Sequence, residues 1–166
     1  MVLADNSNGH GNPHILVLGM GNTLLSDEGA GVLAIRQLAS QLPAQDNLTL
    51  MDGGTLGFTL ATPIAAASHL IVIDAAWLDA SPGTVRLFLN EDMDHFIGYG
   101  KRSAHEIGLT DLMHIAHLTG TLPSQRALIG IQPQDISLGE QPTPPVHAAI
   151  GLACEQARAL IGAWQS

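Results

Sequence analysis

The sequence predicts an α/β protein: a three-layer α/β/α sandwich in which a twisted, mostly parallel sheet of about five strands carries helices on both faces. Short apolar runs, typical of buried strands, alternate along the chain with longer segments whose apolar residues recur at helical spacing. The chain has 166 residues, 46% of them hydrophobic, which is enough for one sizeable core. We therefore expect a single domain over residues 14–166, preceded by a flexible tail over residues 1–13.

The amino-terminal part of the chain predicts a strand followed by a helix. An unbroken apolar run over Ile15–Leu18 ends in glycine, which is typical of a strand buried on both faces. A helix is expected to start near Ser26 and to end before Pro43. Its apolar positions recur at helical spacing and are Val32, Ile35, Leu38 and Leu42.

Two more strands are predicted in the first half, with a helix or turn between them. The second strand covers about Leu48–Met51, and a helix or turn from Thr55 leads to the third strand. The third strand is the apolar run Leu70–Ile73, which ends at Asp74. A β-α-β-α-β order favours a parallel sheet, because each parallel crossover places its helix over the sheet.

The next segment predicts an edge strand, a loop and a helix. Thr84–Leu89 follows a turn signal and is expected to form a strand, for which an antiparallel place at the edge of the sheet is one arrangement. Residues 91–102 are expected to be loop-like. Ser103 and Glu106 have the spacing of a capping box, which predicts a helix over residues 104–118.

The carboxyl-terminal part predicts the last core strand and a long helix. The strand is expected over Ala127–Ile131, and a proline-rich connection follows it. Thr143 and Pro144 are typical of a helix start. One face of this helix is apolar and consists of Val146, Ile150, Ala153, Ala157, Leu160 and Trp164.

Composition and charge exclude several classes of partner and location. Fifteen acidic against six basic residues give a net charge of −9, which argues against binding nucleic acid or an anionic membrane surface. The single cysteine, Cys154, cannot form an internal disulfide and favours a reducing compartment. No secretory leader and no membrane-spanning apolar run are recognised. We expect a cytoplasmic protein with no membrane insertion.

Four residues with useful chemistry are expected at the edge where the parallel strands end. Asp27 and Glu28 follow the first strand, Asp74 ends the third, and His105 opens a later helix. At 100° per residue, His105 shares the inward face of its helix with Leu109. Two carboxylates and one imidazole suit a borderline transition ion such as nickel or zinc.

Each of these residues also has a structural interpretation. A carboxylate in the first turn of a helix balances the helix dipole, Asp74 can act as a helix cap, and His105 can be a satisfied core histidine. Glycines around Asp27 and Glu28 favour a functional role, because they let a partner approach closely. His114 and His117 are turned away from the sheet and are expected at the surface, and Cys154 is expected in the core.

Five sequence blocks resemble those of the nickel-iron hydrogenase maturation endopeptidases. The blocks occur in the family's order and at compatible spacing, and they are ILVLGMGN at 15–22, LSDEGAGV at 25–32, DGGT at 52–55, IDA at 73–75 and SAHEIGL at 103–109. Any one block is weak, since glycine-rich turns are common, but the set together is specific. The resemblance covers residues 15–164.

The resemblance implies a cytoplasmic endopeptidase that removes a carboxyl-terminal extension from a hydrogenase large-subunit precursor after nickel insertion. Glu28, Asp74 and His105 match the family's three metal-contacting positions. The nickel is then supplied by the substrate and serves as a recognition handle, and no organic cofactor is expected. A carboxylate near the metal would act as the base, and Asp27 is the candidate.

Two other functions are weighed against this one. A dinucleotide-binding oxidoreductase is suggested by Gly19-Met20-Gly21 after a strand and by Asp52, which ends the next strand. Leu24 stands in place of the third glycine, and acids at the helix start oppose a pyrophosphate. A nickel-binding assembly chaperone without catalysis is the non-enzymatic alternative, because three ligands alone can bind and release an ion.

Overall fold

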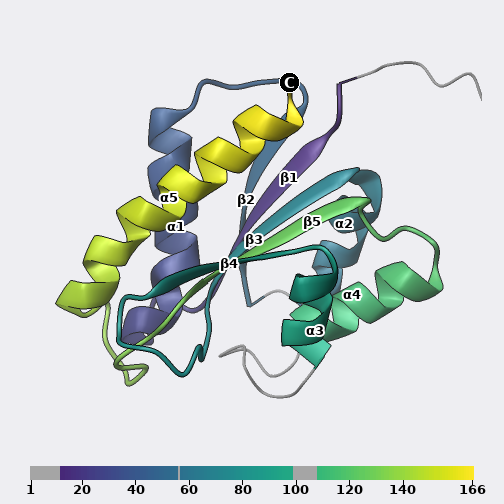
Figure 1. Ribbon diagram of the computed structural model, residues 1–166. Coiled ribbons are helices and arrows are strands. Elements are labelled where there is room, and N and C mark those ends of the chain that lie inside the picture. The colour runs from purple at the N-terminus through teal and green to yellow at the C-terminus, as the bar shows by residue number, and fades with distance from the viewer. Residues whose placement is uncertain (1–11, 56, 99–107) are drawn as a thin grey trace, which may run out of the picture.

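The computed structural model describes residues 12–55, 57–98 and 108–166 (Figure 1). Over these residues the strands form one sheet in the order β2-β1-β3-β5-β4. The strands are β1 (Ile15–Met20), β2 (Leu48–Gly54), β3 (His69–Ala75), β4 (Val85–Leu89) and β5 (Gln125–Ile131). β4 pairs antiparallel with β5 at one edge, and all other pairs are parallel. The predicted mostly parallel sheet is confirmed, and so is its antiparallel edge strand.

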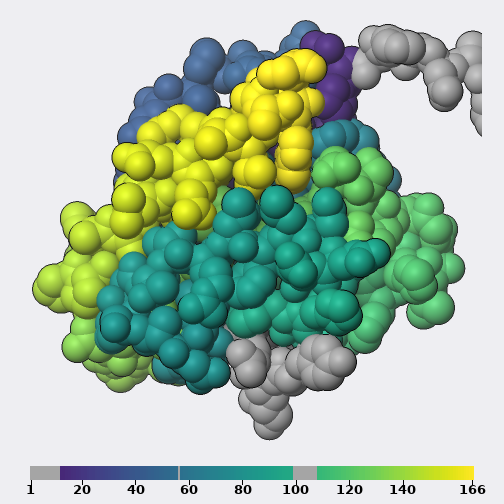
Figure 2. All heavy atoms as spheres, viewed as in Figure 1, coloured from purple at the N-terminus to yellow at the C-terminus, as the bar shows by residue number. Residues whose placement is uncertain are grey.

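Helices cover both faces of the sheet, which confirms the three-layer sandwich (Figure 1). One face carries α1 (Ala30–Gln41) and α5 (Pro144–Trp164), and the other carries α2 (Ala61–Ala66), α3 (Glu91–Gly98) and α4 (Leu109–Leu118). Short 3-10 turns, η1 (Ser26–Gly29) and η2 (Gly57–Leu60), precede α1 and α2. α5 also contacts β4, and the two elements meet on the surface shown in Figure 2.

The central strands are buried on both faces, as their apolar runs predict. All six residues of β1 are buried. Ile15 and Val17 point into the core beneath α1 and α5, whereas Leu16 and Leu18 point into the core beneath α2, α3 and α4. Burial of each such side chain contributes about 1.5–3 kcal/mol, so a one-residue slip of β1 would exchange the two sets of contacts at high cost.

The expectation of a loop over residues 91–102 is wrong for its first part, because residues 91–98 form α3. Three acids in the first turn favour a helix start, since they lie at the positive end of the helix dipole. Met93 is fully buried, and Phe96 stacks on Phe88 with ring centroids 4.2 Å apart. Tertiary packing of these side chains stabilises a helix too short to be evident from periodicity.

Two predicted helix starts differ from the structure or lie outside it. The segment at Ser26 begins with η1 and becomes α-helical only at Ala30. Of the helix predicted over 104–118, the described part is α4, and the capping box at Ser103 and Glu106 lies outside the described residues. Within the described ranges, no helix combines the length and the hydropathy that a membrane crossing requires.

Candidate active site

Glu28 and Asp74 lie at the carboxyl ends of two neighbouring parallel strands. Glu28 belongs to η1, which follows β1, and Asp74 is the penultimate residue of β3. Both residues are buried, with 6% and 1% of their surface exposed. η1 contacts β3 directly. The structure therefore brings these two sequence-predicted residues to the same edge of the sheet, where α/β proteins bind their ligands.

Glycines allow this close packing of η1 and α1 on the strand ends. A Cβ at Gly31 would lie 2.2 Å from the Ile73 carbonyl oxygen and 2.4 Å from the Met20 carbonyl oxygen. Gly21 has φ of +139°, and a Cβ there would lie 2.0 Å from the Glu28 carbonyl oxygen. No other residue type fits at either position, so the glycines fix where Glu28 sits relative to β1 and β3.

Asp27 is fully buried and binds the segment that leads into α5. Its Oδ2 accepts the backbone N–H groups of Gln134 at 2.8 Å and of Asp135 at 2.9 Å. Its Oδ1 accepts the backbone N–H of Thr143 at 2.6 Å. The Thr143 hydroxyl also donates to Asp27, 2.9 Å from Oδ2. Thr143 is the N-cap of α5, so the carboxylate of Asp27 takes the place of a local helix cap.

Further hydrogen bonds join the connection 133–143 to the residues around η1. The backbone N–H of Ser26 donates to the Gly139 carbonyl at 2.8 Å, and its hydroxyl donates to the Ser137 carbonyl at 2.8 Å. The Gly139 N–H donates to the Leu24 carbonyl at 2.9 Å. The backbone on either side of Asp27 is therefore fixed, and the neighbouring Glu28 is held with it. The sequence predicts the proline-rich connection but not its hydrogen bonds to the residues around η1.

His105 lies outside the described residues, so its predicted place beside Glu28 and Asp74 stays a prediction. In the described part of the chain, no group of three histidine, cysteine, aspartate or glutamate residues is arranged to hold a metal ion. Two members of the predicted ligand set, Glu28 and Asp74, therefore belong to the described residues, and the third lies outside them.

The other chemically active residues are placed as the sequence predicts. His114 and His117 are exposed on α4. Cys154 is fully buried between α1 and α5, where its thiol contacts the Ala34 carbonyl oxygen at 3.5 Å. Burial raises the pKa of the Cys154 thiol, and a nearby Arg158 opposes this only in part. A buried thiol with a raised pKa is unsuited to nucleophilic catalysis.

A polar hollow of about 210 Å³ lies where β1 and β2 end. Its lining includes Gly21, Asn22, Thr23, Arg36, Asp52 and Gly54. Arg36 pairs with Asp52 across it at 3.7 Å, with both side chains exposed, and Asp52 also accepts the Gly54 N–H. Its lining residues Gly21, Asn22 and Thr23 are close to Glu28 in the sequence, and the sequence does not predict the hollow.

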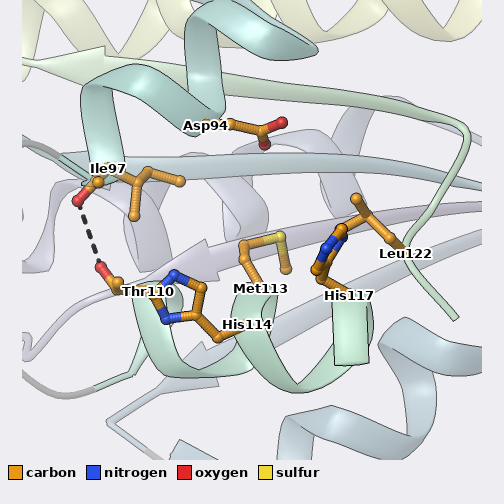
Figure 3. Close-up of a pocket in the computed structure, with 8 residues that line it drawn as sticks. Asp94, Ile97, Thr110, Met113, His114, His117 and Leu122 are labelled. Carbon is orange, nitrogen blue, oxygen red and sulfur yellow. Dashed lines mark hydrogen bonds between the residues drawn. The ribbon is translucent and has the colours of Figure 1, made fainter. Parts of the chain in front are cut away.

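Another hollow, of about 180 Å³, lies between α3 and α4 and is mostly apolar (Figure 3). Asp94, Ile97, Thr110, Met113, His114, His117 and Leu122 line it. The Thr110 hydroxyl donates to the Ile97 carbonyl at its rim. The guanidinium of Arg126 donates to Asp94, and this hydrogen bond raises the pKa of Arg126. The acid of this hollow therefore already has a structural partner.

The chain is similar to hydrogenase maturation proteases in sequence and in structure. A family model described as hydrogenase maturation protease matches residues 32–159. Hydrogenase expression/formation protein HupD of Bradyrhizobium diazoefficiens is 37% identical over 151 residues, which cover 90% of this chain and 79% of that protein. The hydrogenase maturating endopeptidase HybD of Escherichia coli superposes with a TM-score of 0.83 at 35% identity, covering 89% and 91% of the two chains. The [NiFe] hydrogenase maturation protease HybD of Thermococcus kodakarensis gives 0.75 at 31% identity, covering 89% and 98%.

Proposed function

Since this chain belongs to the hydrogenase maturation protease family, and is therefore an endopeptidase, we propose that it cleaves the carboxyl-terminal extension of a nickel-iron hydrogenase large-subunit precursor after nickel insertion. The observation that carries the proposal is the pair of buried carboxylates, Glu28 and Asp74, at adjacent strand ends. The similarity to a protein described as a [NiFe] hydrogenase maturation protease supports nickel as the metal of the substrate. We propose the cytoplasm as the compartment, in keeping with the single, buried cysteine.

The proposed task of Glu28, Asp74 and His105 is to bind the nickel ion that the precursor already carries. Two carboxylates and an imidazole form a mixed oxygen and nitrogen set, which suits a borderline ion and leaves coordination positions open. The two acids attract the cation electrostatically, and their burial strengthens that attraction relative to water. A metal ion next to the scissile bond polarises its carbonyl group toward attack by water. The enzyme recognises the loaded substrate through the metal and brings no metal of its own.

For Asp27 we propose a positioning role in place of the base suggested by the sequence. A general base needs a lone pair within reach of the proton that it removes. Both carboxylate oxygens of Asp27 already accept hydrogen bonds from Gln134, Asp135 and Thr143, and the side chain is not exposed. The carboxylate is therefore better suited to fixing the backbone of Glu28 than to exchanging protons with water.

The test is intact-mass measurement of a precursor, with and without nickel, before and after incubation with this protein. We expect loss of one short carboxyl-terminal peptide from the nickel-loaded form alone. Glu28→Gln, Asp74→Asn and His105→Leu are each expected to abolish this cleavage while the protein remains folded. Glu155→Gln, the same change as Glu28→Gln but on the exposed surface of α5, is the matched control and should cleave normally.

Several results would contradict the proposal. Equal cleavage of the nickel-free precursor would exclude recognition through the metal. Near-normal cleavage by all three site variants would exclude their proposed role. Tight nickel binding by the protein alone, with the precursor mass unchanged, would favour the non-catalytic nickel chaperone instead.

A further inference from the structure

The exposed large apolar side chains of the described residues are concentrated at the edge of the sheet that holds Glu28 and Asp74. Each member of this group lies in a segment that follows one of the four parallel strands. The group consists of Leu24 after β1, Phe58 after β2, Trp77 after β3, and Ile136 and Leu138 after β5. We call these five residues the apolar rim.

The topology places the apolar rim around the active site. β2, β1, β3 and β5 are neighbours and run parallel, so the segments after them emerge at the same edge. The hydrogen bond from the Gly139 N–H to the Leu24 carbonyl joins the first and last of these segments. The backbone segments of Leu24 and Leu138 are thereby brought next to each other. Leu24 is also close in sequence to Asp27 and Glu28.

The remaining exposed large apolar residues of the described chain lie elsewhere. Leu89 ends the antiparallel strand β4 and pairs with Ala127, and Leu118 ends α4 before β5 begins; both therefore lie toward the opposite edge of the sheet. Leu152 lies on the outer side of α5. Scattered single residues of this kind are normal, whereas several at one functional edge indicate a surface that another molecule covers.

The segment that carries Ile136 and Leu138 is already fixed before any partner binds. Asp27 and Ser26 hold the connection 133–143 through hydrogen bonds to its backbone. A surface fixed in this way loses little conformational entropy on binding, so more of the gain from apolar burial appears as affinity.

We propose that the apolar rim is the docking surface for the folded body of the hydrogenase large-subunit precursor, which contacts it through apolar side chains near the cleavage site. This inference rests on the proposed function, because the scissile bond must reach Glu28 and Asp74, and the protein that carries the bond must then lie against the residues around them. The net charge of −9 makes a second, equally acidic copy of this chain a poorer occupant of the same surface.

Leu138→Ser tests the proposal, and Leu118→Ser is its matched control. The two leucines are 85% and 84% exposed, but only Leu138 belongs to the apolar rim. Binding of nickel-free precursor, which we expect not to be cleaved, is measured by biolayer interferometry with the site residues unchanged. KM and kcat for cleavage are measured with nickel-loaded precursor. We expect Leu138→Ser to raise Kd and KM at least tenfold with kcat unchanged, and Leu118→Ser to stay within twofold.

A second rim variant, Phe58→Ser, repeats the test at a different segment, with melting temperature as the check on folding. Wild-type Kd in both rim variants, or equal weakening by Leu118→Ser, would overturn the proposal. Self-association in ultracentrifugation that Leu138→Ser abolishes, with precursor binding intact, would assign the surface to a second copy and overturn it as well. If the unaltered protein cleaves no precursor, the proposed function fails, while the binding comparison still decides the role of the rim.

Discussion

Replacing Asp27 by asparagine isolates the contribution of one buried carboxylate to both stability and the active site. Asparagine keeps the size of the side chain but has a single acceptor oxygen, so its NH₂ group must face a backbone N–H. In one orientation of the amide the NH₂ group faces the N–H of Thr143, and in the other it faces the N–H groups of Gln134 and Asp135. An unsatisfied buried donor costs about 1–3 kcal/mol, and loss of the charge at the start of α5 adds about 0.3–1 kcal/mol. We expect a total loss of about 1.3–4 kcal/mol.

Urea denaturation followed by circular dichroism measures this loss, and Thr143→Val provides the comparison. The valine variant removes only the hydroxyl donor and keeps the backbone N–H, so we expect it to lose about 0.5–1.5 kcal/mol. A loss below about 0.5 kcal/mol for Asp27→Asn would refute the idea that the carboxylate fastens the connection 133–143 to η1. The pH profile of cleavage separates the two possible roles: a positioning residue leaves its shape unchanged, whereas loss of a base removes its acidic limb.

Two further predictions concern packing and pH. Gly31→Ala should lower stability by about 2–4 kcal/mol and reduce cleavage, because the added methyl group meets two fixed carbonyl oxygens. The control is Gly151→Ala on α5, whose methyl group meets nothing within 4 Å and which should be neutral or stabilising. Similar melting temperatures for the two variants would contradict this prediction. Burial lowers the pKa of His69, partly offset by a hydrogen bond with Ser68, so the folded state favours the neutral ring that contacts Trp164. The contribution of neutral His69 to stability is present above the ordinary pKa of 6.5 and is lost as pH falls through that value and below. His69→Phe should therefore reduce the drop in melting temperature between pH 8 and pH 5. An equal drop in both proteins would rule out His69 as a source of the pH dependence.

The layers and most strands follow from the sequence because they depend on local patterns. The apolar runs that form β1 and β3 are long enough to identify buried strands, and the carboxyl end of β3 locates Asp74. α3 was not predicted, because it is short and its stability comes from the burial of Met93 and the stacking of Phe96 on β4. No single-sequence pattern reports contacts of that kind.

The candidate site likewise has features that the sequence predicts and features that it does not. Glycines around η1 and the positions of Glu28 and Asp74 are visible in the sequence, because Glu28 lies in the glycine-rich segment after β1 and Asp74 ends the apolar run of β3. The partners of Asp27 are not visible, since Gln134, Asp135 and Thr143 are 107 to 116 positions away and meet it through backbone groups. The apolar rim is likewise assembled from segments that only the sheet topology brings together.

The hydrogen bonds between Asp27 and Thr143 also set an order of events in a newly synthesised chain. They join residues 116 positions apart, so the backbone beside Glu28 gains this support only after Thr143 has left the ribosome. Contacts of such long sequence separation form late in folding, because their loop-closure entropy is not recovered until the rest of the sheet is in place. A partly synthesised chain ending before residue 133 therefore carries Glu28 but lacks the segment whose hydrogen bonds fix the backbone beside it.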